Sequence, residues 1–209
     1  MRFGTALAGV VLMLALLQGF LSMGFQLVAS RLLAPHFGTT LIVWAFLIST
    51  FLAAFSAGAF MGSFTSRLKT HRRRVAIAVQ GLIGVTFFAL VAFAGRPLLR
   101  LIETSFEQLW AGLAAACGLL FLIPVAALSA ILPVLAETFA GEGRSAGVAS
   151  GVIYGVSTLG NIAGVMTTAF LLIPNFSTPA LLTGWFVVSL VCFGAVVLAM
   201  PDHAAKPVQ

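Results

Sequence analysis

The chain has 209 residues, of which 61% are hydrophobic and only 8% are charged, and its net charge is +6. A soluble domain carries about a quarter charged residues, so this composition excludes a soluble enzyme domain and predicts an integral membrane protein. Six of the eleven basic residues lie at Arg2 or between Arg67 and Arg74, where they are topology signals rather than a nucleic-acid surface.

A membrane span needs about 20 apolar residues, and the chain has room for about six. We therefore expect an all-α bundle of about six transmembrane helices in a single domain (1–200), followed by a short cytoplasmic tail (201–209). The expected spans are 6–30, 40–65, 75–95, 110–131, 147–173 and 179–199.

The first expected span carries a stripe of polar side chains. Four of them follow one another at four-residue spacing and share one slowly drifting face of an α-helix: Gln18, Ser22, Gln26 and Ser30. Lipid cannot satisfy amides and hydroxyls, so this face should meet other helices or line a wet cavity. Arg31 follows directly, and it is either a snorkelling anchor at the span end or part of a binding site.

The second expected span carries small residues, including Gly58 and Gly62, at four-residue spacing. Such ladders let helix backbones approach closely, so they predict helix packing. A dense basic run follows in what we expect to be a short loop, on the cytoplasmic side by the positive-inside rule. Its residues are expected to set topology and to contact lipid headgroups: Arg67, Lys69, Arg72, Arg73 and Arg74.

Prolines and tryptophans divide the middle of the chain. The third span is expected to end before Pro97, and residues 98–110 then read as an amphipathic segment at the membrane surface. Pro124 predicts a kink in the fourth span, which is expected to end at Pro133. Three tryptophans are expected at the interfaces: Trp44, Trp110 and Trp185.

The fifth expected span combines glycines with a polar face. Two GxxxG-type series predict helix packing along it: Gly147, Gly151 and Gly155, then Gly160 and Gly164. Between them, a second face presents polar groups for substrate binding or interhelical hydrogen bonds: Tyr154, Thr158 and Asn161. With the basic run and both ends on one side, both termini are predicted to be cytoplasmic.

No charged chemistry falls inside the expected spans. All five carboxylates lie outside them, whereas proton-coupled carriers usually rely on a buried acid or histidine. The histidines are scattered and both cysteines are isolated, so we predict no metal site, no cofactor and no catalytic residues.

Three segments together resemble a known family. They are Gln26 to Gly38 (Q-x4-R-L-L-A-P-x-F-G), Pro124 to Pro133, and the run from Gly147 through Tyr154 and Asn161 to Pro174. The chain resembles the membrane domain of fused spermidine synthase-like proteins, whose soluble synthase domain is absent from this sequence. The resemblance implies a six-span module like half of a major facilitator fold.

Two functions remain open. The first is a non-catalytic membrane subunit or anchor in the inner (cytoplasmic) membrane, which assembles with a synthase-like enzyme, a larger membrane complex or itself. The alternative is a dimeric half-transporter for polyamines or other small polar solutes, with substrate between two six-span halves. An integral-membrane enzyme has the least support, because no acid, base or nucleophile cluster is present.

Overall fold

The computed structural model describes residues 2–141 and 144–199, and these residues form helices without strands. Six helical segments are long and apolar enough to cross a membrane, which confirms the all-α prediction. The first three spans are α1 (Arg2–Phe37), α2 (Leu41–Ser66) and α3 (Thr70–Ser105). The predicted tail at 201–209 lies outside the described residues, and the single-domain assignment stays a prediction.

The last three spans are less regular. The fourth consists of α4 (Leu109–Cys117), the π-helical segment η1 (Gly118–Leu122), α5 (Ile123–Ser129) and α6 (Ile131–Ala140). The fifth consists of α7 (Ala146–Thr167), a second π-helical segment η2 (Thr168–Leu172) and α8 (Ile173–Asn175). The sixth is α9 (Thr178–Ala199).

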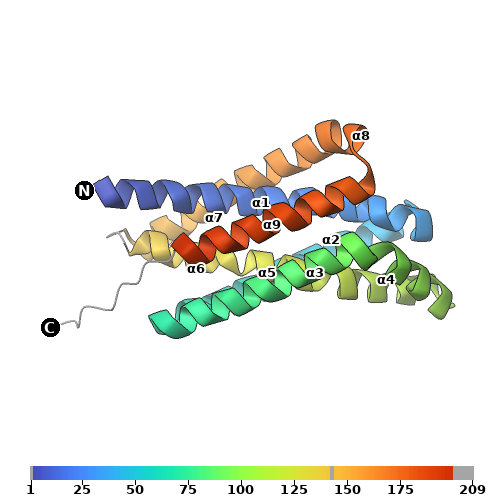
Figure 1. Ribbon diagram of the computed structural model, residues 1–209, viewed down its shortest axis with the longest axis horizontal. Coiled ribbons are helices and arrows are strands. Elements are labelled where there is room, and N and C mark those ends of the chain that lie inside the picture. The colour runs from blue at the N-terminus through green and yellow to red at the C-terminus, as the bar shows by residue number, and fades with distance from the viewer. Residues whose placement is uncertain (1, 142–143, 200–209) are drawn as a thin grey trace.

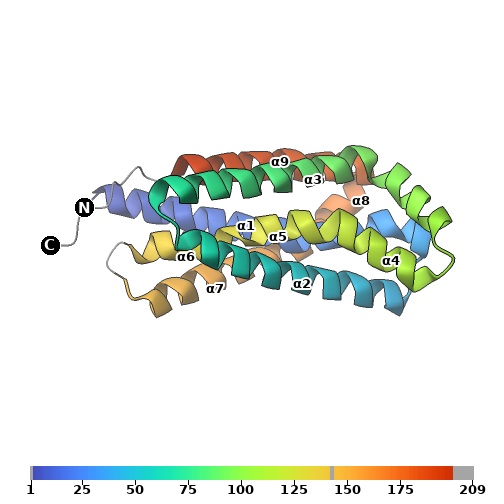
Figure 2. The same cartoon turned by 90° about the horizontal axis from the view of Figure 1, so that it is seen from below.

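The spans run up and down in three layers. Helices α3 and α9 lie side by side in one layer, α1 and the fourth span lie in the middle, and α2 and α7 lie on the opposite side (Figure 2). The start of α1 and the ends of α2, α6 and α9 all lie at the same end of the bundle (Figure 1). This arrangement fits six consecutive crossings.

The middle layer forms the core. In the apolar stretch of the fourth span 72% of the residues are buried, against 22% in the fifth span. Phe25 of α1 lies at the centre of an aromatic cluster, with ring centroids 4.9 Å from Phe88 and 5.8 Å from Phe121 in edge-on contact. Phe51 of α2 completes this phenylalanine cluster at 6.1 Å from Phe25. Such offset and edge-on pairs add to the free energy of burial.

Two π-helical segments precede prolines. Proline has no N–H to donate to the carbonyl four residues earlier, and its ring crowds that carbonyl. For Pro124 and Pro174 these carbonyls belong to Leu120 and Phe170, each of which lies inside a π-helical segment. The wider turns therefore relieve the clash at both places. At Pro124, where we predicted a kink, the structure has this π-helical turn in the preceding residues.

Other prolines do not end helices where we expected. Pro97 lies inside α3, which continues to Ser105 because Leu99 and Ile102 are buried against the core. The expected separate segment at 98–110 is therefore wrong over most of its length. At Pro133 the helix breaks just before the proline, at Ala130, and α6 then continues to Ala140 with Val134 and Phe139 buried.

The expected basic loop is shorter than its charged run. Only residues 67–69 connect α2 to α3, and Arg72, Arg73 and Arg74 lie in the first two turns of α3. Positive charge is unfavourable at a helix N-terminus. These arginines are therefore not there to stabilise the helix, which is consistent with a role in topology.

Glycines bring two pairs of spans into close contact. A side-chain carbon at Gly58 or Gly62 of α2 would collide with backbone carbonyls of Ala126 or Ala130 in the fourth span. Gly160 and Gly164 of α7 lie equally close to the Leu16 and Phe20 carbonyls of α1, and Gly19 of α1 lies against the Ser157 carbonyl of α7. Only glycine permits such backbone approach.

Gly147, Gly151 and Gly155 lie differently on α7. They are exposed, and apart from their chain neighbours and the adjoining backbone of α7 itself, no heavy atom of the described chain lies within 4 Å of the position that a side-chain carbon would take. Their outward-facing sides meet no other helix of the described chain, so a packing role for those sides would require another chain.

Two single residues, Gly38 and Trp185, have structural roles in joining or packing helices. Gly38 follows the end of α1 with a φ of +76°, a left-handed conformation that suits glycine and forms the turn into α2. Trp185 does not lie at an interface: it is 5% exposed, and its indole Nε1–H donates to the Leu21 carbonyl of α1 at 2.9 Å.

Candidate functional site

A hydrogen-bonded chain of neutral side chains joins α1 to α7 inside the bundle. The Ser157 hydroxyl donates to Gln18 Oε1 at 2.9 Å, and Gln18 Nε2 donates to Ser22 Oγ at 2.9 Å. All three side chains are at most 3% exposed. An amide and hydroxyls buried inside the bundle need such partners. The two hydrogen bonds therefore fix the orientation of the Gln18 side chain.

These groups face a cavity of about 160 Å³ between α1, α2, the α5–α6 junction and α7. Tyr154, Thr158 and Asn161, which were predicted on a separate face of the fifth span, line the same cavity. Tyr154 is 41% exposed, so the cavity reaches the surface of the bundle beside α7. We call this space the polar cavity; its ten lining residues are Gln18, Ser22, Phe55, Ala59, Ser129, Leu132, Tyr154, Ser157, Thr158 and Asn161.

The other half of the predicted stripe lies elsewhere. Gln26 is buried but does not line the polar cavity, and Ser30 is half-buried, with its hydroxyl donating to the Leu27 carbonyl of its own helix. A four-residue step advances about 400° around a helix, so the stripe drifts by about 40° at each step. Over two further steps the stripe turns away from the cavity.

Sequence reasoning missed two serines. Ser157 was recognised only as part of a motif, and Ser129 was not singled out, because a lone serine in an apolar span carries no periodic signal. Ser129 lies at the end of α5, immediately before the break at Ala130, and its side chain is buried. The sequence offered one signal, because Pro133 has no N–H to donate to the Ser129 carbonyl four residues earlier. An irregular helix was therefore predictable next to Ser129.

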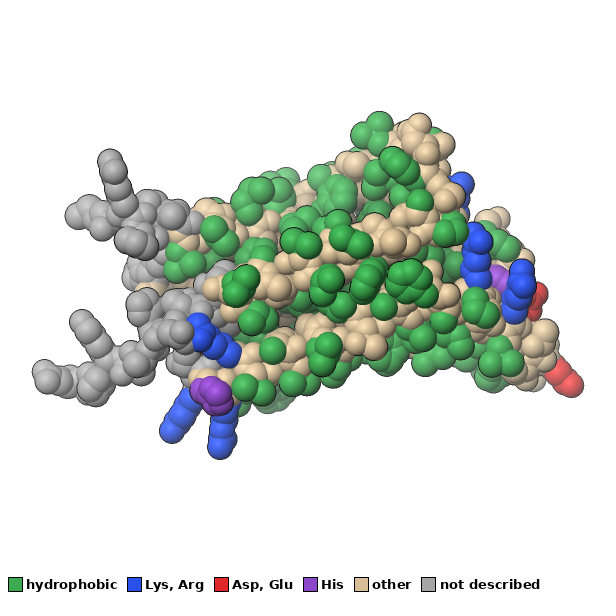
Figure 3. All heavy atoms as spheres, viewed as in Figure 1, with side chains coloured by type: hydrophobic (Ala, Val, Ile, Leu, Met, Phe, Trp, Pro, Cys, Tyr) green, Lys and Arg blue, Asp and Glu red, His purple; other side chains and the backbone are tan. Residues whose placement is uncertain are grey.

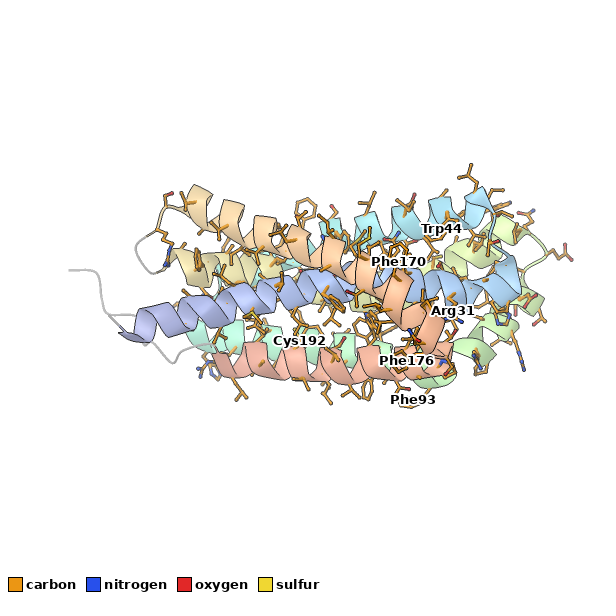
Figure 4. All side chains as sticks on the ribbon, turned by 90° about the horizontal axis from the view of Figure 1, so that it is seen from above. Arg31, Trp44, Phe93, Phe170, Phe176 and Cys192 are labelled. Atoms are coloured by element: carbon orange, nitrogen blue, oxygen red, sulfur yellow. The ribbon has the colours of Figure 1, made fainter. Side chains whose placement is uncertain are left out.

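Arg31 lies at the opposite end of the stripe and binds a helix end. Its Nη1 donates to the Ile173 carbonyl at 2.5 Å and to the Phe176 carbonyl at 3.4 Å, at the end of α8 (Figure 4). The last carbonyls of a helix lack intrahelical partners, so the guanidinium satisfies them. A second pocket of about 340 Å³ lies beside it, bordered by Ser30, Thr39 and Trp44 among others.

Charged groups gather at the two ends of the bundle, with apolar side chains covering the flank between them (Figure 3). His36 Nδ1 lies 2.7 Å from Glu103 Oε2 at the end that holds Arg31. At the other end Arg73 Nη1 lies 3.4 Å from Glu137 Oε2, while Arg67, Lys69 and Arg72 are exposed. Both ion pairs are partly exposed and contribute little to stability.

The polar cavity is lined by neutral hydrogen-bonding groups and apolar side chains. Its lining contains amides, hydroxyls and a phenol, without a carboxylate, amine or imidazole. Within residues 2–141 and 144–199, no group of three or more His, Cys, Asp or Glu side chains could hold a metal ion. The arrangement can therefore donate and accept hydrogen bonds to an uncharged molecule.

Comparison with known proteins gives a partial likeness. A curated protein from Rhodobacter capsulatus, the cytochrome c-type biogenesis protein ccl1, is 43% identical over 68 residues, which are 32% of this chain. The match spans about 10% of that protein's length. No family model matches, and no solved structure matches. The resemblance to the spermidine synthase-like membrane domain stays a prediction; the chain is a multi-pass membrane protein with six apolar helices.

Proposed function

We propose that this chain is a non-catalytic subunit or anchor of the inner membrane, which assembles with another protein through one face of α7. This α7 outer face consists of Gly147, Gly151, Tyr154, Gly155 and Thr158, which point in similar directions on an ideal helix and are all exposed. Each glycine costs a helix about 1 kcal/mol relative to alanine. Within this chain no close packing offsets that cost at these three positions.

The observation that carries the proposal is the contrast between the two faces of α7. On the inner face, Gly160 and Gly164 let α1 approach to backbone contact. On the outer face the same spacing of small residues meets nothing, although Tyr154 and Thr158 are polar groups at membrane depth. A neighbouring transmembrane helix would bury the exposed backbone and offer partners to the phenol.

Two kinds of partner are supported to different degrees. The family resemblance favours a separately encoded synthase-like enzyme. The partial likeness to a cytochrome c-type biogenesis protein favours a larger membrane assembly. In either case the outer face of α7 is the site of contact, and the chain supplies membrane attachment rather than chemistry.

Cross-linking tests the contact directly. Gly151→Cys places a thiol on the α7 outer face, whereas the native Cys117 and Cys192 are buried. In native membranes we expect a thiol-reactive cross-linker to give one discrete higher-mass adduct. Leu82→Cys on the exposed side of α3 is the control and should give none. Two differently tagged copies then distinguish a second copy of this chain from another protein.

A matched pair of glycine variants tests whether the α7 outer face is needed for assembly with the partner. Gly151→Leu should displace the partner, so that the complex seen on a native gel shifts to the mass of the isolated chain. Gly194→Leu on α9 makes the same change at another exposed glycine with open space and should leave the complex intact. Equal complex sizes for the two variants and the wild type would overturn the proposal.

A dimeric half-transporter is the second candidate, and the polar cavity is the observation in its favour. The cavity opens beside α7, where a second six-span unit could complete a path. Uptake of labelled small polar solutes into vesicles containing the purified chain tests it. This candidate loses its basis if those vesicles take up no more solute than protein-free vesicles.

A further inference from the structure

Ser129 has an unusual hydroxyl for a membrane helix. Serine and threonine in spans commonly donate to a carbonyl three or four residues earlier in the same helix. Ser30, Ser63, Thr138 and Thr158 all do so here. The Ser129 side chain is 96% buried by contrast (4% exposed), yet its Oγ has no hydrogen-bond partner within the described chain.

Ser129 lines the polar cavity together with other residues that have unused hydrogen-bonding capacity. Gln18 Nε2 uses one of its two hydrogens on Ser22, and Ser22 Oγ accepts that bond while its own hydrogen remains available. An unsatisfied buried polar group costs about 1–3 kcal/mol, so an occupant that pairs with Ser129 is favoured. The apolar part of the cavity wall is formed by Phe55, Ala59 and Leu132.

Charge decides what kind of occupant can enter. The cavity lining has no charged side chain, and an unpaired ion in such a place pays a large desolvation cost. A cationic polyamine or a carboxylate is therefore disfavoured. An uncharged molecule with a primary amide head can accept from the hydroxyls through its carbonyl and donate to them through its N–H groups, while its apolar part contacts the wall.

Size sets the upper limit. At about 160 Å³ the cavity is smaller than pockets for drug-sized ligands, which start at roughly 300 Å³. An apolar cavity of about 150 Å³ is known to take up benzene. The space therefore fits a single ring with one polar substituent.

We propose that the polar cavity is a binding site for a small uncharged molecule with an apolar body and one hydrogen-bonding head, held by Ser129, Gln18 and Ser22. The ten lining residues all come from one chain, so the isolated chain is sufficient to test the site, although Tyr154 and Thr158 also belong to the α7 outer face. Tyr154 stands at its exposed side, where the ligand enters.

Three probes of the same shape and different charge test the site: 4-fluorobenzamide, 4-fluorobenzoate and 4-fluorobenzamidinium. The full-length protein is placed in lipid nanodiscs, and binding is measured by fluorine NMR, with empty nanodiscs as the reference for partition into lipid. We expect saturable binding of the neutral amide beyond that reference and none of the two ions. Equal behaviour of the three probes, or no saturable binding because the cavity holds only water, would overturn the proposal.

Two serine variants assign the binding to the cavity. Ser129→Ala should weaken binding of the amide roughly threefold to tenfold through loss of one hydrogen bond. Ser189→Ala is the matched control, because Ser189 is also fully buried with an unpartnered hydroxyl but does not line the cavity. Equal affinity in both variants contradicts the assignment. Ala59→Leu, which fills the cavity from α2, should abolish binding and provides an independent check.

Discussion

Arg31 joins two distant parts of the chain by completing the end of α8. It donates to two carbonyls at 2.5 Å and 3.4 Å, 142 and 145 residues further along the sequence. From the sequence, a snorkelling anchor and a ligand-binding residue were both open. The contacts favour a third role, in which the side chain is a structural cap that holds the connection between α8 and α9.

Replacing Arg31 tests this role. Arg31→Gln should lower the free energy of unfolding by about 1 kcal/mol, since a bond from a charged donor is worth about 1.5–3 kcal/mol when buried and less at this exposed site. It should also speed protease cleavage near Phe176. Thermal unfolding and limited proteolysis in mild detergent measure the two effects. Arg100→Gln, at an exposed arginine on α3, is the control; an equal loss there would show that only charge matters.

Half of the candidate site could be predicted from single residues. Gln18, Ser22, Tyr154, Thr158 and Asn161 were found because amides and hydroxyls are rare in spans and must have partners. That two separate spans bring them to one cavity could not be predicted, since helix periodicity gives a face but not its neighbour. Gln26 and Ser30 were included because they continue the same four-residue repeat. That repeat drifts around the helix, and whether the drift carries a residue out of the site depends on how the helices pack.

At the scale of helices, α7 is a span with two different glycine faces. Spacing alone could not distinguish them, because Gly147, Gly151 and Gly155 repeat as regularly as Gly160 and Gly164. Only packing separates the glycines that touch α1 from those that touch nothing.

Alanine substitution should change the stability of the bundle in opposite directions, or not at all on the outer face, for glycines on the two faces of α7. Gly160→Ala pushes a methyl group into the Leu16 carbonyl and should destabilise the bundle by about 1–3 kcal/mol. Gly155→Ala meets open space and should leave the isolated chain as stable as wild type, or more so by up to about 1 kcal/mol. The midpoint of thermal unfolding in detergent measures both. A loss at both positions would show that the outer face already packs within the chain.

Element boundaries were harder to predict than elements. The number and order of the spans follow from hydropathy, because a 20-residue apolar run has few alternatives in a membrane. Pro97 and Pro133 were read as stops and Pro124 as a kink, whereas helix continues through Pro97 and past Pro133 and a π-helical turn precedes Pro124. The outcome at each proline depends on which neighbours bury the following residues, and this information lies in the tertiary structure.

At the scale of the whole molecule, the orientation in the membrane is still a prediction. The basic residues near Lys69 favour the cytoplasm for that end, which leaves the α3–α4 connection outside. Both connections are exposed, and the two native cysteines are buried, so added cysteines report accessibility with little background.

Labelling of intact cells with a membrane-impermeant maleimide determines the orientation. Gln108→Cys should react in intact cells, whereas Lys69→Cys should react only after the membrane is made permeable. The reverse pattern would place both termini outside and would remove the basis for a cytoplasmic synthase-like partner.

The confinement of charge to the two ends of the bundle has an electrical consequence. Moving one elementary charge across a membrane potential changes the free energy by about 2.3 kcal/mol per 100 mV. In the described chain the apolar flank and the polar cavity contain no ionised group on which that field could act between the two ends. For the uncharged ligand proposed above, we therefore expect occupancy of the cavity to follow ligand concentration and to be the same whether the membrane is energised or at rest.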